Sequence, residues 1–321
     1  MRILVTGGAG YIGGMVALTL VQQGHIVVVY DNLCHSTRAL LPEGASFVQG
    51  DVADRPRLEN LLSSGFDGVM HFAALIEAGE SMQQPERYFR NNSASTLSLI
   101  EAMISTGVHR FVFSSTAAVY GEPDVTPIPE DAPLRPTNAY GESKLLVEKM
   151  LNWMYRVHGF RYASLRYFNV AGAMGGRGEA HEPESHIIPL ILDVALGRRD
   201  KIRIFGDDYP TPDGTCVRDY IHVQDLANAH LLAFEALATH EQLIYNLGNG
   251  AGFSVREVVD AARRVTGHPI PIETVPRRPG DPAVLIASSE KIARELGWKP
   301  QYTTLDAIIA SAWEWHQVRY R

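Results

Sequence analysis

The chain opens with an apolar run rich in β-branched residues, RILVT (residues 2–6), and GGAGYIG (residues 7–13) follows at once. A helical pattern of apolar residues then runs through residues 15–20. A strand, a glycine turn and a helix in this order form the context in which glycines bind the pyrophosphate of a dinucleotide. Gly7 permits the tight turn, Gly10 lets the backbone approach the phosphates, and Gly13 lets the helix pack on the strand. The stretch therefore predicts a dinucleotide site, with the helix N-terminus facing the phosphates.

The second apolar run, HIVVVY (residues 25–30), ends in Asp31. An acid about 20 residues beyond the glycine turn accepts hydrogen bonds from a ribose 2′-hydroxyl, and it would repel a 2′-phosphate. Asp31 therefore predicts NAD rather than NADP. Asp51, after the third run SFVQG (residues 46–50), allows two interpretations that can both hold. It accepts from the adenine amino group, or it caps a helix that starts near Arg55.

Strand and helix patterns keep alternating through the first half of the chain. Strands are expected at 68–73, 110–115 and 162–168, and helices at 85–105 and 140–158. Such alternation implies a parallel sheet with helices on both faces and ligands at the carboxyl ends of the strands. From about residue 171 a long irregular stretch follows, and regular patterns return at 219–237 and 243–247.

The predicted fold is therefore α/β. A Rossmann-type, doubly wound parallel sheet is expected in residues 1–170, and a smaller, partly interleaved C-terminal domain for the substrate in residues 171–321. Segments near 215–247 are expected to return to the Rossmann lobe.

Composition narrows the class of protein. The 321 residues carry a net charge of −7 without a basic stripe, which argues against nucleic acid as a partner. Two cysteines, Cys34 and Cys216, are too few for a disulfide framework, and the absence of a C-x-x-C motif predicts no metal site. No apolar run approaches the 18 or so residues of a membrane span, and the N-terminus enters a strand without a signal-peptide pattern. An enzyme of the cytoplasm is the expectation.

The stretch YGESK (residues 140–144) places a phenol and an ammonium on one helix face, with Cβ atoms about 6 Å apart. A free tyrosine has a pKa of about 10, and a neighbouring cation favours the phenolate. Half ionisation at pH 7 needs about 4 kcal/mol, more than Lys144 alone is expected to supply, so a cationic nicotinamide would share the task. The pattern alone also fits a solvated lysine beside a packed tyrosine, and the dinucleotide signals favour the base.

Further motifs extend along the whole chain: DNL (31–33), HFAA (71–74), SSTAAVYG (114–121), LRYFN (165–169), VRDYIHV (217–223) and RRPGD (277–281). Together with GGAGYIG and YGESK, this set resembles the extended short-chain dehydrogenase/reductase family and, within it, the UDP-glucose 4-epimerases. The resemblance implies a UDP-hexose substrate and a permanently held NAD. It also implies interconversion of UDP-glucose and UDP-galactose through a 4-keto sugar, with the N-acetylated pair as a further candidate.

The resemblance gives three residues catalytic roles. Tyr140 would take the proton of the 4-hydroxyl while hydride leaves C4, and Lys144 would lower the tyrosine pKa and hold the nicotinamide ribose. Thr116 stands where the family usually has a serine that bonds the reacting oxygen. Ala117 and Ala118 stand where related dehydratases carry an Asp-Glu pair, which disfavours dehydration.

The resemblance also implies the binding residues. The cofactor set is Gly7, Gly10, Tyr11, Ile12, Gly13, Asp31, Asn32, Asp51, Val52, Phe72, Ala73, Ala74, Asn91, Ser114, Tyr140, Lys144 and Phe168. The substrate set is Thr116, Tyr140, Asn169, His186, Ile187, Ile204, Phe205, Arg218, Arg278, Asp281 and Leu285.

Within the substrate set, Asn169, Arg218 and Arg278 are expected near the diphosphate and Asp281 on the uridine ribose. His186, Ile187, Ile204 and Phe205 are expected around uracil. Leu285 is the expected wall of the sugar pocket, with Val284 as the alternative if the loop is offset by one residue.

One residue departs from the pattern of the family. Ile76 stands where many family members carry a lysine on the NAD phosphates, so cofactor retention is expected to be weaker.

Two alternative functions remain. One is another enzyme on the same scaffold, a 4-reductase or a decarboxylase. The other is an NAD-sensing protein, which would be expected to lose Tyr140 or Lys144. His222 is interpreted as a core or strand-end histidine rather than a base. Homodimers pairing the helices near 88–105 and 140–157 are what the resemblance implies.

Overall fold

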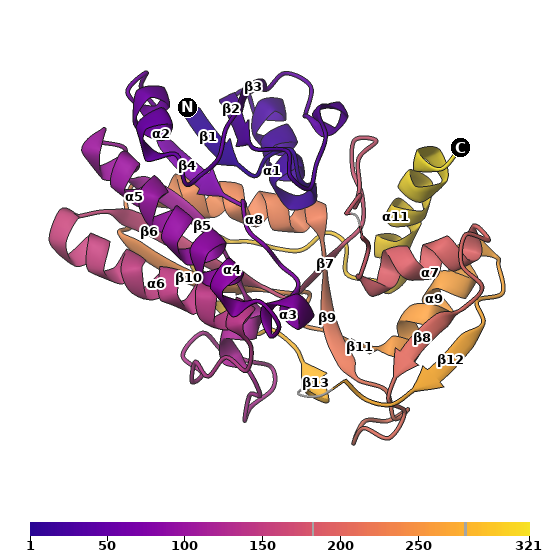
Figure 1. The fold of residues 1–321 in the computed structure, drawn as a ribbon. Coiled ribbons are helices and arrows are strands. Elements are labelled where there is room, and N and C mark those ends of the chain that lie inside the picture. Colours follow the sequence, from indigo (N-terminus) through magenta and orange to yellow (C-terminus); the bar gives the residue numbers. More distant parts are fainter. Residues whose placement is uncertain (182, 279–280) are drawn as a thin grey trace.

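A parallel sheet forms the centre of the first lobe (Figure 1). The computed structural model describes residues 1–181, 183–278 and 281–321. Within these residues seven strands join in the order β10-β6-β5-β4-β1-β2-β3, and every neighbouring pair is parallel. Their bounds are β1 Arg2–Thr6, β2 Ile26–Asp31, β3 Ser46–Gln49, β4 Gly68–His71, β5 Arg110–Thr116, β6 Arg161–Tyr167 and β10 Gln242–Leu247. The strand order reverses between β1 and β4, which is where such sheets bind ligands.

Helices cover both faces of this sheet. Because side chains alternate along a strand, Ile3 and Val5 of β1 point to one face and Leu4 to the other. The first face packs against α1 (Tyr11–Gln22) and α8 (Val223–Ala236). The second packs against α2 (Arg55–Leu62), α5 (Ser95–Ser105) and α6 (Ala139–His158). The predicted α/β fold with a Rossmann-type sheet is confirmed.

The helix expected over residues 85–105 is divided. It consists of α4 (Pro85–Tyr88), a π-helical turn η2 (Phe89–Ala94) and α5, and the short α3 (Ala78–Ser81) precedes it. Short 3-10 turns stand at η1 (Arg38–Leu40) and η3 (Ala117–Tyr120). A π turn inside a helix often marks a functional site, and here it carries Asn91 and Asn92.

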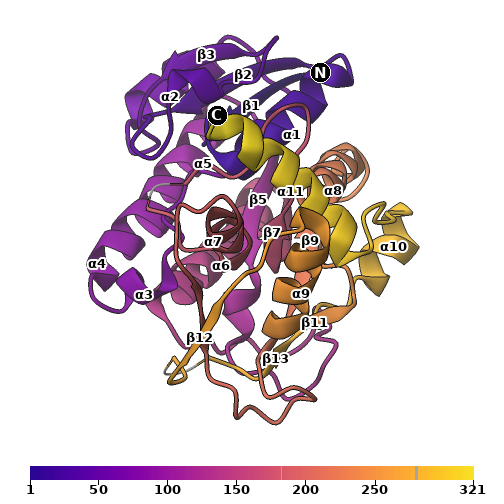
Figure 2. The ribbon, with the colours of Figure 1, turned by 90° about the vertical axis from the view of Figure 1, so that its right-hand side faces the viewer.

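The second lobe has its own core of helices on small sheets (Figure 2). Helices α7 (Ile187–Ala195), α9 (Val255–Thr266) and α11 (Leu305–Arg319) share one buried apolar cluster. Strand β9 (Val217–His222) pairs with β7 (Asn169–Ala171), β11 (Gly252–Ser254) and β13 (Val284–Leu285), while β8 (Ile202–Phe205) pairs with β12 (Ile272–Val275).

The chain passes between the two lobes more than once. It leaves the large sheet after β6, enters the second lobe at β7, and returns through α8 to add β10 beside β6. Helix α10 (Glu290–Leu296) then lies against the first lobe, where Ile292 joins the core beneath α8. Among the described residues, no helix combines the length and apolar character needed to cross a membrane.

Candidate active site

The glycine turn between β1 and α1 is closely packed. Gly7 has φ +71°, and a Cβ built on it would lie 2.5 Å from the backbone nitrogen of Ala73. A Cβ on Gly13 would lie 2.4 Å from the Gly7 carbonyl oxygen. Helix α1 starts after Gly10, and within the described residues no side chain caps this end. Its first N–H groups therefore suit an anion such as a pyrophosphate.

Asp31 lies beside this turn at the end of β2. Its Oδ2 accepts from the backbone N–H of Ala9 (3.1 Å), and its Oδ1 accepts from the N–H of Leu33 (2.8 Å). The carboxylate is thereby fixed where the ribose of a dinucleotide is expected. Turn and carboxylate together fit NAD.

Asp51 does not cap a helix. Its Oδ1 accepts from the N–H of Ala53 (2.8 Å), and its Oδ2 accepts from the side-chain amide of Asn32 (2.8 Å). The cap of α2 is Asp54, whose carboxylate accepts from the N–H of Arg57 (3.1 Å). The helix-cap interpretation of Asp51 is therefore wrong. Asp54, not Asp51, directly precedes the first helical residue, Arg55, and Asp51 closes the turn after β3 instead.

The other cofactor candidates lie around the carboxyl edge of the sheet. Tyr11 and Ile12 form the first turn of α1, and Phe72, Ala73 and Ala74 follow β4. The ring of Phe72 packs on His230 (4.9 Å between ring centres), so its backbone rather than its ring faces the glycine turn. The remaining members are buried or half-buried in the same region: Val52 after β3, Asn91 in η2, Ser114 in β5 and Phe168 after β6.

The predicted catalytic residues meet at the end of β5. Lys144 of α6 is 2% exposed, and its Nζ donates to the Ser114 carbonyl (2.8 Å). Burial lowers the pKa of Lys144 to about 7. Burial also raises the pKa of Tyr140, whereas a hydrogen bond with Thr116 acts in the opposite direction. Thr116 Oγ accepts from the Ala118 N–H (3.1 Å), which leaves its own proton for the tyrosine or a ligand.

A buried ion pair beneath this centre was not predicted. Arg166 of β6 donates to Glu148 of α6 (2.5 Å between Nη2 and Oε2), and the side chains are 3% and 6% exposed. Ser115 Oγ donates to the same carboxylate (2.5 Å). Buried pairs add little net stability, but breaking one is costly, so this pair fixes α6 against β5 and β6. The available signal was spacing, because Glu148 follows Lys144 by one helical turn.

Asn92 is a second residue that sequence reasoning missed. Its Oδ1 accepts from the Leu75 N–H (2.9 Å), and its Nδ2 donates to the Leu75 carbonyl (2.9 Å) and to Ser143 Oγ (3.1 Å). The predicted Asn91 donates to Asn92 Oδ1 (3.0 Å). Asn92 therefore ties the loop after β4 to the helix that carries Tyr140. Its signal was a pair of asparagines inside an apolar helical pattern.

Two candidates of the second lobe pair with each other, one for the phosphate and one for the ribose. Arg218 of β9 forms an ion pair with Asp281 and donates to the Val217 carbonyl (2.8 Å). The guanidinium of Arg278 lies 3.9 Å from the ring centre of Phe205. Pro279 and Gly280 of the RRPGD motif lie outside the described residues.

The apolar candidates have different surroundings. Leu285 of β13 packs, like Phe168, against the buried cluster that contains Leu145. Ile204 is 1% exposed in a core cluster with Tyr209, so Phe205 rather than Ile204 has surface to offer a base.

Asn169 lies in β7, and His186 ends the irregular segment that connects β7 to α7. Asn169 donates to the Asp219 carbonyl (3.2 Å). His186 occupies the N-cap position of α7, which begins at Ile187, but within the described residues its side chain makes no cap hydrogen bond. His222 ends β9, accepts from the Gln224 N–H (3.1 Å) and stacks on Tyr302 with ring centres 3.7 Å apart. Burial lowers the pKa of His222 to about 4. This environment is that of a strand-end histidine, as expected.

Comparisons with known proteins agree with this geometry. A family model described as "NAD dependent epimerase/dehydratase family" matches residues 3–248. A UDP-glucose 4-epimerase of Streptomyces lividans is 56% identical over 317 residues, which cover 98% of this chain and 96% of that protein. The corresponding Corynebacterium glutamicum enzyme is 53% identical over 314 residues, or 98% and 95% of the two chains.

Solved structures agree as well. One crystal structure of a UDP-glucose 4-epimerase has a TM-score of 0.97 at 51% identity and covers 100% of this chain and 99% of its own. The enzyme from Brucella ovis in complex with NAD has a TM-score of 0.95 at 44% identity, with 98% and 97% coverage. The resemblance noted in the sequence is confirmed, and this chain belongs to the NAD dependent epimerase/dehydratase family.

Proposed function

We propose that the protein interconverts UDP-glucose and UDP-galactose with a tightly held NAD. The observation that carries the proposal is the meeting of Tyr140, Thr116 and Lys144 beside the glycine turn. Relatives that match almost the whole chain are named UDP-glucose 4-epimerases, which supports the same reaction.

The cofactor would lie across the carboxyl edge of the sheet. The turn at Gly7–Gly13 would hold its pyrophosphate and Asp31 the adenosine ribose, with the remaining cofactor set around them. When bound, NAD would supply reversible hydride transfer at C4 of the sugar.

The chain's own residues would move the proton. Tyr140 would take it from the 4-hydroxyl and return it, and Thr116 would hold the same oxygen by a hydrogen bond. Burial opposes ionisation of Tyr140, so its phenolate needs a nearby cation. Lys144 is placed one helical turn away for that purpose. Because burial lowers its own pKa to about 7, a bound nicotinamide cation would have to share the task. The buried pair Glu148–Arg166 would keep α6 in register with β5.

The nucleotide would bind in the second lobe. Arg218 and Arg278 offer guanidinium groups whose planar geometry suits phosphate oxygens, and the carboxylate of Asp281 suits ribose hydroxyls. Since Arg218 pairs with Asp281, a diphosphate would replace a contact that already exists. Residues 1–170 would thus serve mainly the cofactor and residues 171–321 mainly the nucleotide sugar, with β9, α8 and β10 linking them.

Leu285 favours a second pair of substrates. It packs in an apolar cluster near Leu145 and Phe168 and brings no hydroxyl to the sugar pocket. A leucine leaves more room than a tyrosine would for an acetamido group on C2. We therefore include the N-acetylated UDP-hexoses in the proposal, to be tested with UDP-N-acetylgalactosamine beside UDP-galactose.

The proposal includes a homodimer acting in the cytoplasm. On α6, Trp153 and Val157 are 60% and 68% exposed, on a helix that the resemblance assigns to the dimer interface. Large exposed apolar side chains on one helix are typical of a surface that another copy covers. Sedimentation of the purified protein tests this part.

The decisive test mixes the purified protein with UDP-galactose and catalytic NAD. UDP-glucose should accumulate to equilibrium with no net change in NADH absorbance. A 4-reductase would instead consume stoichiometric NAD(P)H, and a decarboxylase would release carbon dioxide. Absence of UDP-glucose from protein that carries NAD would reject the proposal.

A further inference from the structure

A segment of the second lobe crosses the ligand edge of the large sheet. Residues 172–181 and 183–186, here called the strap, connect β7 to α7. Helix α11 holds the middle of the strap, because Trp315 Nε1 and Arg319 Nη1 donate to the Glu179 carbonyl (3.2 and 3.0 Å). The strap is therefore fixed to its own lobe.

The strap also contacts two loops of the cofactor lobe. The hydroxyl of Tyr11, at the start of α1, donates to the Gly172 carbonyl (2.6 Å). Arg177 donates to the carbonyl of Leu41, in the loop after β2 (3.0 Å). In the same loop the ring of His35 stacks on His181, with ring centres 5.8 Å apart.

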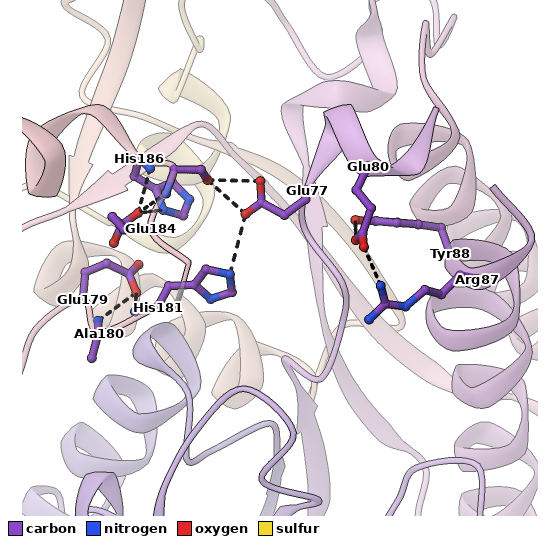
Figure 3. Close-up of polar contacts among 10 residues, drawn as sticks. Glu77, Glu80, Arg87, Tyr88, Glu179, Ala180, His181, Glu184 and His186 are labelled. Carbon is purple, nitrogen blue, oxygen red and sulfur yellow. Dashed lines mark hydrogen bonds and ion pairs between the residues drawn. The ribbon is translucent and has the colours of Figure 1, made fainter. Parts of the chain in front are cut away.

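A further contact closes the strap on the loop after β4 (Figure 3). Ser185 Oγ lies 3.0 and 3.1 Å from the two carboxylate oxygens of Glu77, and His181 Nε2 lies 3.6 Å from Oε1. Glu77 stands at the N-cap of α3, yet among the described residues its carboxylate does not cap that helix. It points across to the second lobe instead.

Both sides of this contact are braced. On the cofactor lobe, Glu80 of α3 accepts from Tyr88 Oη (2.8 Å) and Arg87 Nη1 (2.5 Å), which ties α3 to α4. On the strap, Glu184 Oε1 accepts from the N–H groups of Ser185 (2.8 Å) and His186 (2.7 Å) and from His186 Nδ1 (2.8 Å). Ser185 is thus presented to Glu77 by a folded turn rather than a loose loop.

The strap therefore touches the start of α1, which follows the glycine turn after β1, and the loops after β2 and β4. These are the strand ends along which a dinucleotide lies in this fold. Ile76, immediately before Glu77, offers no charge to the phosphates. A bound dinucleotide would have to pass the strap to leave.

We propose that Glu77 is a positioning residue that fastens the strap over the cofactor and so retains NAD. The proposal rests on NAD as the cofactor and not on the sugar reaction. Release of NAD requires the bond between Ser185 and Glu77 to open. A hydrogen bond to an ionised acceptor is about twice as strong as a neutral one. Its loss should speed NAD release about 10-fold, which corresponds to about 1.4 kcal/mol.

The test measures the rate at which NAD leaves the loaded protein, in the absence of sugar. Freed NAD is trapped by an NAD-consuming dehydrogenase. Glu77→Ala and Ser185→Ala are compared with each other and with the double variant. Glu86→Ala on the neighbouring α4 is the matched control, since Glu86 is an exposed glutamate outside the strap contact.

Each single variant should release NAD about 10-fold faster than the wild type, and the double variant no faster than Glu77→Ala, because Glu77→Ala already removes the contact with Ser185 together with the one to His181. The control should match the wild type. Release at the wild-type rate from both single variants, or effects that multiply in the double variant, would overturn the proposal. Ser185 is exposed, so Ser185→Ala tests the contact even if Glu77→Ala folds poorly. A protein that shows this pattern but fails to convert UDP-galactose would refute the reaction and leave the role of Glu77 standing.

Discussion

At the reactive centre Lys144 donates to the backbone carbonyl of Ser114 and is 2% exposed, whereas Arg218 in the second lobe pairs with the carboxylate of Asp281. The first arrangement leaves the catalytic groups in place before a ligand arrives. If a diphosphate binds at Arg218 as proposed, the second would have to exchange one ionic partner for another. Changes at the first should therefore reduce kcat, and changes at the second should raise KM.

The largest effect is expected from Tyr140→Phe, which keeps the ring and removes the acid–base oxygen. Turnover should fall by at least about 100-fold, the low end of acid–base contributions. The content of bound NAD should stay at the wild-type level, because the Tyr140 hydroxyl is not needed to hold Lys144, which donates to the Ser114 carbonyl. Initial rates with UDP-galactose and the NAD released on denaturation measure the two quantities. Near-normal turnover would remove Tyr140 from the mechanism.

Arg218→Gln should act on binding. It removes the charge offered to the diphosphate, so KM for UDP-galactose should rise about 10- to 100-fold, as for loss of a hydrogen bond to a charged group. The value of kcat should change much less. Arg203→Gln on β8 is the matched control, since Arg203 is 66% exposed and pairs with Glu273. Equal effects of the two substitutions would show that Arg218 has no special role.

Leu285→Tyr should distinguish the two substrate pairs. The larger ring should reduce turnover of UDP-N-acetylgalactosamine at least about 10-fold while sparing UDP-galactose, because overpacking costs about 1–3 kcal/mol. Leu285→Met, of similar volume, controls for disturbance of the apolar cluster. If the wild type itself ignores the acetylated substrate at enzyme levels that convert the plain one, the wall assignment is wrong.

The smallest expected effect is a pH dependence of stability that comes from His186. The pKa of this histidine is shifted in the opposite direction to that of His71 in the first lobe. Burial, followed by the charge of Lys144, lowers the pKa of His71 to about 3. For His186 burial acts in the same direction, but the hydrogen bond to Glu184 and neighbouring carboxylates prevail and raise the pKa to about 9. A raised pKa stabilises the fold below pH 6.5, and this stabilisation is lost as the pH rises through 9.

Glu184→Gln should therefore lower stability at pH 6 and have little effect at pH 9.5. The His186 side chain is 41% exposed, so solvent screening should keep the difference below about 1 kcal/mol. Thermal unfolding at both pH values measures it, and the imidazole titration in NMR spectra should move toward 6.5. A variant that is equally destabilised at both values would indicate a loss of loop packing instead.

The cofactor lobe was far easier to predict than the second lobe. The composition and the apolar periodicity of residues 2–6 and 140–158 predict a strand and a helix. The bounds of the observed β1 and α6 agree with these predictions within one residue. In contrast, β7, β11 and β13 contain two or three residues each, too few to show an alternation, and each depends on β9 for pairing. Long-range pairing of short strands leaves no local signal.

Buried polar residues were missed for a related reason. Glu148, Arg166 and Asn92 have the composition of a protein surface, and only the folded structure shows that they satisfy one another or a backbone segment. The helix-cap interpretation of Asp51, one of two that the sequence left open, is wrong because the rule fixes the residue type but not which of two nearby aspartates starts the helix.

Strand β10 is far later in the chain than β6, the strand with which it pairs, and this separation has a consequence for folding during synthesis. The chain emerges from the ribosome N-terminal end first, so β6 waits at an open sheet edge until residues 242–247 are made. An unpaired parallel edge can recruit strands from other chains. A fragment ending near residue 170 should therefore aggregate rather than fold as a free cofactor-binding module. Expression of the two halves as separate proteins should succeed only when both are present in the same cell.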